Sequence, residues 1–379
     1  MKFNFDEEIA RNESNSYKWD FFNDPADLIP MWVADTDFRC SPAILDSQQK
    51  IVDHGVLGYA MCPKELKEVF VARMKNLYNW EIKQEWLVWL PGLVTGLTNA
   101  IKTVCQPSGA YMTYTPVYHP FHLASTWTSK PIQLTEMIEV DCRYTLDFEA
   151  IIKTITPETK MFLLCNPHNP GGTVFRKEEL LALIAICEEH NIIICSDEIH
   201  CDLILDDNCT HIPLASLSDW AAENTITLFS PSKTFNIAGL GGSVAVIKNE
   251  ALRTAYINSK EGLVPMISRH AYLAALAGYR DSEDWRLEQI AYLKSNHDYL
   301  VSELNGYNGL KVNALEATYL AWVDATATGK NDVGNLLIKN GVRVNDGIVF
   351  KGEGFFRVNF GCTRKNLEEG IRRIKIAFA

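Results

Sequence analysis

The chain has 379 residues, of which 47% are hydrophobic, and acidic residues outnumber basic ones by 47 to 36, which gives a net charge of −11. This length suffices for a substantial core, arranged as one large domain with a smaller one or as two similar domains. The acidic balance excludes the basic footprint of a nucleic-acid-binding protein. Acids near the N-terminus and the lack of any run of about 18 apolar residues predict no signal peptide, no transmembrane helix and no membrane partner.

Taken in chain order, the first fifty or so residues have few long periodic elements, so they form an arm or complete the smaller domain. Residues 89–102 have the pattern of a strand end, a turn and a helix. Further on, short apolar runs alternate with helical periodicity, as expected of a mostly parallel sheet covered on both faces. The predicted strands are 160–165, 192–195, 225–229 and 243–247, and the predicted helix between the first two is 176–191.

The last hundred residues have a different pattern, typical of an α+β domain. Residues from about 280 to 305 are charged and helical. Strand-like stretches follow at 311–324, 343–350 and 355–361, and residues 366–379 predict a closing helix.

None of the ten cysteines forms a C-x-x-C pair, and most lie in apolar runs. We expect buried free thiols in a reducing cytoplasm. One cluster has the composition of a metal site and comprises Cys195, His200, Cys201, Cys209 and His211. Its spacings match no usual zinc pattern, so we predict no metal.

Polar side chains follow three of the predicted strands. NPHNPGG with Asn169 follows the first, SDEIH with Asp197 and His200 the second, and SPSK with Lys233 the third. Each has an ordinary alternative: a tight turn for NPHNPGG, a helix cap for Asp197 and a solvated loop position for Lys233. Ligands bind beyond the carboxyl ends of the strands in open parallel sheets, so neighbouring strands would bring these groups together.

A lysine amine at a desolvated position can form a Schiff base with an aldehyde cofactor. Pyridoxal phosphate requires such a lysine and an acid partner for its ring nitrogen. An asparagine amide can donate to its phenolate oxygen, and the helix start near Val94 and Thr95, with Ser230 and Ser232, suits its phosphate. Tyr118 in TPVYHPF offers a ring to stack on the pyridine face.

On these motifs the chain resembles the fold-type I pyridoxal-phosphate enzymes of the class I/II aminotransferase superfamily. NPHNPGG, SDEIH and SPSKTFNIAGL occur in order, with spacings of 28 residues from Asn169 to Asp197 and 36 from Asp197 to Lys233. More narrowly, MWVADTDF, HGVLGYA, TPVYHPF and ATYLAWVD resemble the MalY/PatB group of cystathionine β-lyases. The resemblance covers nearly the whole chain. It implies an aspartate aminotransferase-like α/β fold: a large domain with a mostly parallel seven-stranded sheet between helices, and a smaller α+β domain.

The resemblance also implies residue roles. Lys233 would be the Schiff-base lysine, Asp197 the partner of the pyridinium nitrogen and Asn169 a contact of the phenolate oxygen. Tyr118 would stack on the ring and count with Lys233 and Asp197 as catalytic. His200 would lie near the phenolate oxygen, where many aminotransferases have a tyrosine. Domain boundaries follow at residues 1–48 for an arm and part of the small domain, 49–275 for the large domain and 276–379 for the small domain.

Other implied roles concern binding. The phosphate would be held by Ser230, Ser232 and the main-chain amides of Val94 and Thr95. Tyr59 would reach the phosphate of the neighbouring subunit, which makes the active unit a homodimer with shared sites. Arg357 in FFRVNFG would bind the substrate carboxylate with its planar fork. Many aminotransferases carry a phosphate-binding arginine eight residues after the lysine; here that position is Gly241, as in the β-lyase group.

The implied activity is α,β-elimination on cystathionine or a related cysteine S-conjugate in cytoplasmic amino-acid metabolism, including methionine biosynthesis. The products would be a thiol (homocysteine from cystathionine), pyruvate and ammonia. An aminotransferase on the same fold stays open, because fold alone does not decide function. A non-catalytic regulatory protein is disfavoured by the joint presence of Lys233, Asp197, Asn169 and Arg357. A Rossmann dehydrogenase is disfavoured too, since GLGGSV at 239–244 precedes a strand rather than opening a helix.

The preferred sulfur amino acid does not follow from the sequence. Four aromatic residues are candidates to line its distal pocket or to lie in the core: Trp32, Tyr118, Tyr319 and Trp322.

Overall fold

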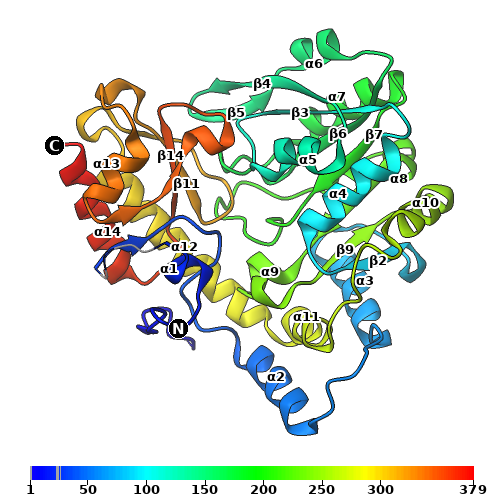
Figure 1. Cartoon of the computed structure of the whole chain (residues 1–379), viewed down its shortest axis with the longest axis horizontal. Helices are drawn as coiled ribbons and strands as arrows, with labels where there is room; N and C mark the ends of the chain where they lie inside the picture. The colour runs from blue at the N-terminus through cyan, green and yellow to red at the C-terminus, as the bar shows by residue number, and fades with distance from the viewer. Residues whose placement is uncertain (1, 23–24, 26) are drawn as a thin grey trace.

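The computed structural model describes residues 2–22, 25 and 27–379. In this part of the chain a large sheet occupies one half of the molecule and a small sheet the other, with a long helix, α12, between them (Figure 1). The strands of the large sheet in spatial order are β2 (Leu87–Leu90), β9 (Ser243–Val246), β8 (Thr225–Phe229), β7 (Ile193–Asp197), β6 (Thr159–Cys165), β3 (Ala110–Thr115), β4 (Ile132–Val140) and β5 (Arg143–Leu146).

Five adjacent strands of the large sheet, β8 to β4, run parallel. Strand β9 is antiparallel to both β8 and β2, so β2 points the same way as the five. These seven strands match the expected mostly parallel sheet. An eighth strand, β5, was not expected; it pairs antiparallel with β4 after a short turn and extends the edge of the sheet.

Helices cover both faces of the large sheet. Alternate residues of one strand point to opposite faces, and here they enter different cores. Leu228 of β8 packs in the core that contains Leu97 of α4, whereas its neighbour Phe229 packs in the core that contains Phe70 of α3. The helices near the large sheet are α3 (Lys64–Tyr78), α4 (Leu93–Val104), α5 (Pro120–Thr128), α6 (Phe148–Thr154), α7 (Lys177–Glu189), α8 (Asp219–Asn224), α9 (Pro231–Thr234), α10 (Glu250–Lys260) and α11 (Arg269–Asp281).

The small sheet has the order β10-β11-β14-β13 and is antiparallel. Its strands are β10 (Lys311–Val312), β11 (Leu320–Asp324), β13 (Asn345–Asp346) and β14 (Phe355–Asn359). The accompanying helices are α12 (Glu283–Leu304), α13 (Val333–Lys339) and α14 (Arg364–Ala377).

Two strand predictions in this half were wrong in extent. Residues 311–324 form two strands rather than one, because the chain turns between them at Thr318, whose φ of 78° is not extended. Residues 343–350 contain a two-residue strand and then a 3-10 helix at Gly347–Phe350, which starts where the Asp346 carboxylate accepts the amide of Ile348. The other predicted elements agree with the structure to within a few residues.

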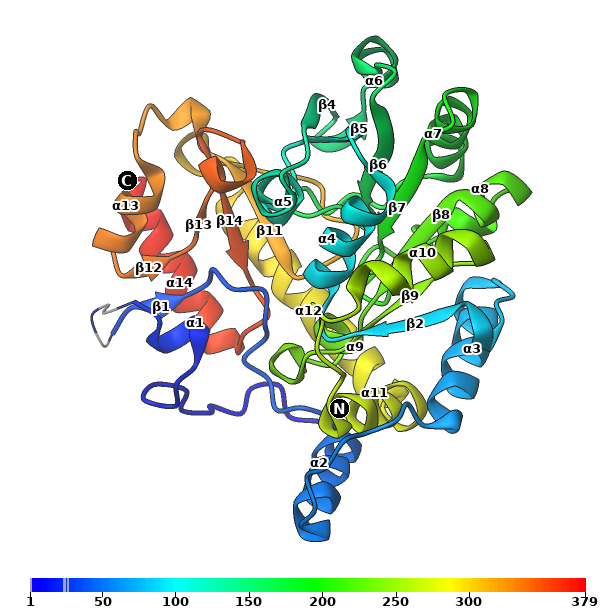
Figure 2. The same ribbon diagram turned by 45° about the vertical axis from the view of Figure 1, so that its right-hand side comes forward.

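The N-terminal segment joins the two halves. It includes α1 (Tyr17–Asp20) and β1 (Ile29–Pro30), and β1 pairs parallel with β12 (Val342–Arg343) of the C-terminal half. The chain then passes toward α9 before α2 (Pro42–His54), which projects away from the rest of the molecule in both views (Figures 1 and 2). The domain boundaries predicted at residues 48 and 275 stay predictions.

Among the described residues, no helix is both long and apolar enough to cross a membrane. Seven of the ten cysteines are buried and all ten are free thiols.

Candidate active site

Neighbouring strands of the large sheet end at one edge, and each is followed by a predicted site residue. In spatial order, β8 leads to Lys233, β7 ends at Asp197 and leads to His200, β6 leads to Asn169, and β3 leads to Tyr118. Because these four strands are parallel and adjacent, their carboxyl ends bring the five side chains to one place. The convergence predicted from the strand exits is therefore present.

Lys233 lies on α9, a single helical turn that begins directly after β8. Ser230 caps this turn by accepting the amide of Ser232, and Pro231 occupies the first helical position, where its missing N–H costs nothing. Lys233 Nζ donates to the carbonyl oxygen of Ala34 at 2.6 Å. Burial lowers the pKa of the Lys233 amine from its ordinary value to about 8, so near neutral pH its uncharged fraction is much larger than that of an ordinary lysine.

Asp197 is the last residue of β7 and is 2% exposed. One carboxylate oxygen accepts the amide of Ile199 at 3.1 Å. Burial raises the pKa of Asp197 to about 7, although the nearby Lys233 charge acts in the opposite direction. A buried carboxylate in this state is suited to a cationic partner, such as the protonated ring nitrogen of pyridoxal phosphate.

Asn169 and His200 are buried beside Asp197. Asn169 uses its amide oxygen to accept from Arg357 Nη1 at 2.9 Å, which leaves its amide nitrogen to donate to a ligand. Burial lowers the pKa of His200 to about 3, so its ring is neutral. Its Nδ1 is buried and has no hydrogen-bond partner among the described residues. An orphaned buried nitrogen at this point fits a polar atom of a bound group.

The first turn of α4 provides an anion-binding surface at the same edge. Its N-cap residue is Gly92, which gives no side-chain hydrogen bond, so the first amides, including those of Val94 and Thr95, are not capped by a side chain. Uncapped amides and the helix dipole favour a phosphate group. The hydroxyl of Ser230 lies 2.6 Å from the Gly242 carbonyl and 2.9 Å from the Ser232 hydroxyl, on the opposite side of the same hollow.

Gly241 shows why no arginine occupies this position. Its φ is +62°, and an added Cβ would lie 2.6 Å from the carbonyl oxygen of Pro91. This close approach holds the turn before α4 against the turn before β9. A phosphate bound here would therefore depend on main-chain amides and serines.

These groups surround a cavity of about 330 Å³, which we call the cofactor cavity. It has the size of a small-molecule site. Nine predicted residues line it: Val94, Thr95, Tyr118, Asn169, Asp197, His200, Ser230, Ser232 and Lys233.

Arg357 lies beside this cavity on β14 and is 4% exposed. Besides Asn169, it donates to the carbonyl oxygen of Trp32 at 2.9 Å and to Asn345 Oδ1 at 2.7 Å. Its Nε has no hydrogen-bond partner, and no carboxylate within the described chain lies at ion-pair distance. Burial lowers the pKa of Arg357 to about 10, which still leaves it cationic at neutral pH. A buried cation without a counter-charge is suited to a substrate carboxylate.

The sequence analysis missed contacts made by the MWVADTDF segment. The Ala34 carbonyl accepts both from Lys233 and from the Tyr319 hydroxyl at 3.0 Å, and the Trp32 carbonyl accepts from Arg357. Main-chain carbonyls carry no residue signature, so no pattern could have found them. Asn236 was detectable, since it lies three residues after Lys233; its side chain bonds the main chain of Thr36 and Phe38.

Other predicted site residues lie apart from the cavity of their own chain. Tyr59 is 98% exposed and does not line it. Trp322 is fully buried and stacks on Phe355 at 5.2 Å, so it is a core residue. Within the described residues, no group of three or more His, Cys, Asp or Glu side chains could hold a metal ion. His211, from the cluster considered above, instead pairs with Glu198 at 2.7 Å.

Comparisons with known proteins agree with this geometry. The family "Aminotransferase class I and II" matches residues 28–374. The cystathionine β-lyase PatB of Bacillus subtilis is 35% identical, and the alignment covers 99% of this chain and all of PatB. The crystal structure of OvoB is 42% identical with a TM-score of 0.96 and covers 100% of this chain and 99% of OvoB. The crystal structure of the pyridoxal-phosphate-bound C–S lyase of Staphylococcus hominis is 32% identical with a TM-score of 0.92. The match covers 100% of this chain and 98% of the lyase.

Proposed function

The chain belongs to the class I and II aminotransferase family, and from this premise we propose that it is a pyridoxal-phosphate-dependent carbon–sulfur β-lyase. The observation that carries the proposal is the buried Lys233 amine beside Asp197 in a cavity flanked by the unpaired cation Arg357. The relatives support elimination rather than transamination, since PatB and the Staphylococcus hominis protein are both named as lyases.

The residues fit pyridoxal phosphate at each of its polar groups. Asp197 would hold the ring nitrogen, Asn169 the ring oxygen with His200 close by, and Tyr118 the face of the ring. The phosphate would lie against the amides of Val94 and Thr95 and the hydroxyls of Ser230 and Ser232. When bound, the cofactor supplies an aldehyde that captures the substrate amino group and a ring that withdraws electrons from it.

The chain's own residues would then act on the amino acid. Arg357 binds the α-carboxylate and so fixes the orientation of the Cα–H bond. The Lys233 amine, whose pKa of about 8 suits a base at neutral pH, would remove the Cα proton. The electron pair of that bond forms the Cα–Cβ double bond and the thiolate leaves from Cβ. The thiolate takes up a proton to become the thiol, and the released aminoacrylate tautomerises to an imine that water hydrolyses to pyruvate and ammonia.

The proposed unit is a cytoplasmic homodimer with shared sites. Exposed apolar side chains occur in the last turn of α2, in the segment between α2 and α3 and in the segment before α11, namely Val52, Val56, Leu57, Tyr59, Met61, Leu263 and Met266. Exposed apolar side chains of this kind support a second copy of the chain as the partner. Tyr59 would then contact the phosphate in the partner's cofactor cavity.

One substrate tests the proposal against transamination. The holoenzyme is incubated with L-cystathionine, with and without an added 2-oxo acid, and thiol and pyruvate are measured. A lyase releases both at a rate that does not depend on the 2-oxo acid. Release that requires the 2-oxo acid, with a new amino acid formed from it, would identify an aminotransferase instead.

A further inference from the structure

The cofactor cavity continues into a second, larger one at the reactive lysine. This cavity, of about 610 Å³, lies against the N-terminal segment, and we call it the N-terminal cavity. It shares three lining residues with the cofactor cavity: Ala34, Lys233 and Ala238. The cofactor cavity has about 330 Å³, most of which the cofactor itself would fill. Groups attached to Cβ of a substrate must therefore extend out of the cofactor cavity.

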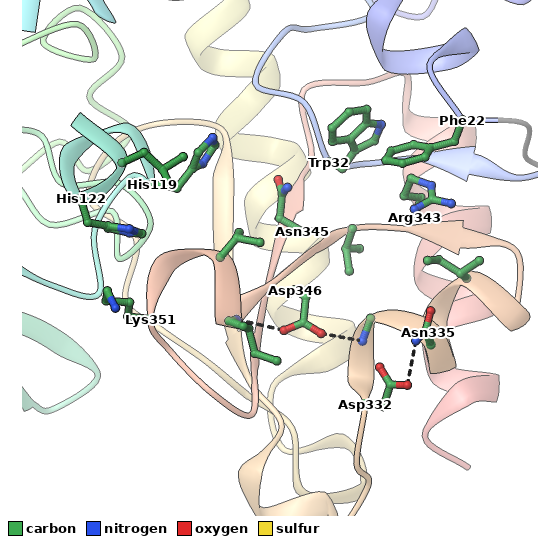
Figure 3. Close-up of a pocket in the computed structure, with 16 residues that line it drawn as sticks. Phe22, Trp32, His119, His122, Asp332, Asn335, Arg343, Asn345, Asp346 and Lys351 are labelled. Carbon is green, nitrogen blue, oxygen red and sulfur yellow. Dashed lines mark hydrogen bonds between the residues drawn. The ribbon is translucent and has the colours of Figure 1, made fainter. Parts of the chain in front are cut away.

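A third cavity, of about 690 Å³, is the main competitor for those groups. Figure 3 shows it between His119, His122 and Lys351 on one side and Trp32 with Phe22 on the other. None of its described lining residues lines the cofactor cavity. Trp32 and Asn345, which accept from Arg357, line this third cavity, whereas Lys233 lines the cofactor and N-terminal cavities and not the third. A Cβ substituent that passes Lys233 therefore enters the N-terminal cavity rather than the third one.

The wall of the N-terminal cavity is polar and charged. Asp35 Oδ2 accepts from Arg11 Nη2 at 2.6 Å, and Arg11 also pairs with Asp37, whose other oxygen is 2.9 Å from Lys18 Nζ. Arg11 Nη2 additionally donates to the Ser16 hydroxyl at 3.0 Å. These contacts hold the carboxylate of Asp35 in place at the cavity.

The second carboxylate oxygen of Asp35 differs from the first in its hydrogen bonding. Asp35 Oδ1 is buried and has no hydrogen-bond partner among the described residues. Lys233 does not satisfy it, since Lys233 Nζ donates to the Ala34 carbonyl. A buried carboxylate oxygen without a donor is costly, and such atoms in native proteins mark a ligand or a catalytic role.

We propose that the N-terminal cavity binds the thiol half of the substrate and that Asp35 selects conjugates whose thiol half carries an ammonium group. This inference rests on the proposed lyase function and names the substrate class for it. The ammonium donates to Asp35 Oδ1 while Arg11 holds Oδ2. Asp35 is a specificity-determining residue, and the bond that breaks stays the one between Cβ and sulfur.

Two conjugates that differ only in this group provide the test. S-(2-aminoethyl)-L-cysteine and S-propyl-L-cysteine have the same chain length, with an ammonium in one and a methyl in the other. The measurement is kcat/KM for pyruvate release from each by the holoenzyme. We expect the wild type to prefer the aminoethyl conjugate by about ten- to a hundredfold, the range of a hydrogen bond to a charged group.

The Asp35→Asn variant should lower this ratio to near one, mainly through KM for the aminoethyl conjugate. Any effect of Asp35 on Lys233 acts on both substrates and cancels in the ratio. The control is His122→Ala in the third cavity, which should keep the wild-type ratio. A wild-type ratio of one or less, or a ratio that Asp35→Asn leaves unchanged, would overturn the inference.

The ratio of the two wild-type kcat/KM values tests the inference even if the Asp35→Asn protein does not fold. A wild type that cleaves S-propyl-L-cysteine without preference removes the inference but leaves the lyase function intact. A wild type that releases pyruvate from L-cystathionine but from neither conjugate also removes the inference alone, whereas no pyruvate from any of the three removes both.

Discussion

In the proposed reaction Lys233 must meet two requirements at once, because the same amine would capture an aldehyde and later accept a proton. Both need the uncharged form, and burial supplies it by lowering the pKa of Lys233 to about 8. The Ala34 carbonyl, 2.6 Å from Nζ, orients the amine without neutralising it. The local structure of α9 therefore prepares the residue for both roles.

Asp197 gives the first prediction at this scale. Replacing Asp197 with alanine should weaken cofactor binding and lower kcat by at least about a hundredfold, since the ring nitrogen would lose its anionic partner. Cofactor titration followed by visible absorbance and pyruvate release measure the two effects. Near-normal activity of Asp197→Ala would show that another group holds the ring nitrogen.

A second prediction concerns stability and pH. His168 is fully buried, its Nε2 lies 2.8 Å from the Pro116 carbonyl, and burial lowers its pKa to about 4. An unfolded histidine has a pKa of about 6.5. The folded form therefore binds fewer protons between these values, so stability is complete above pH 6.5 and falls by up to about 1.4 kcal/mol per pH unit below it.

Urea unfolding of the holoenzyme at pH 7 and pH 5 measures this effect. The wild type should lose more stability between the two values than the His168→Gln variant, which has no titrating ring at that position. Equal losses in the two proteins would contradict the assignment of a neutral buried His168.

The residue types of the site could be predicted from sequence because each follows an apolar strand. Lys233, Asp197 and Asn169 stand out as polar groups directly after buried runs. The contacts of Ala34 and Trp32 could not be predicted, because they are made by main-chain carbonyls 199 and 325 residues from their partners. Asp35 lies within the MWVADTDF motif without a distinguishing pattern of its own, and its unpaired oxygen is visible only in the fold.

At the scale of elements, the turns before α4 and β9 build the phosphate side of the site, and Gly241 lets them meet. Gly241→Ala should destabilise the protein by about 1–3 kcal/mol from the left-handed backbone alone, with more from the contact to Pro91. It should also weaken cofactor binding, because Pro91 adjoins the start of α4. Thermal unfolding and cofactor titration measure both.

The matched control is Gly239→Ala two residues earlier, where an added Cβ meets nothing within 4 Å and φ is not positive. That substitution should leave stability and cofactor affinity close to wild type. If Gly241→Ala and Gly239→Ala have the same stability and cofactor affinity, the close approach of Gly241 to Pro91 does not shape the site.

Elements with strong periodicity were predicted well and short ones poorly. The buried strands β6, β7 and β8 are continuous apolar runs, so their positions follow from the sequence. The two-residue strands β10, β12 and β13 are defined by their tertiary partners rather than by a pattern. The edge strand β5 depends on a turn at Asp141 and Cys142, both with positive φ, which local sequence does not announce.

For the whole molecule, sharing of the sites between two chains gives a sharp prediction. Neither Lys233→Ala nor Tyr59→Ala homodimers should be fully active, since each lacks one part of both sites. In a mixed dimer, one site combines Lys233 of one chain with Tyr59 of the other and is intact. Unfolding and refolding an equal mixture should restore about a quarter of wild-type activity, because half the dimers are mixed and each has one intact site.

The control is each variant unfolded and refolded alone, which should show no gain of activity over the untreated variant. Activity of the mixture equal to the mean of its two parents would contradict a shared site and place Tyr59 outside the phosphate contact. Sedimentation of the wild type reports separately whether the chain is a dimer.

The central claim is β-elimination dependent on Lys233, and pyruvate formed per active site from L-cystathionine, with pyridoxal phosphate and no 2-oxo acid, tests it most directly. The account predicts many turnovers for the wild type and, for Lys233→Ala, a rate lower by at least about a hundred- to ten-thousandfold. Pyruvate that stops at one equivalent or less, or multiple turnovers by Lys233→Ala at a comparable rate, would contradict it.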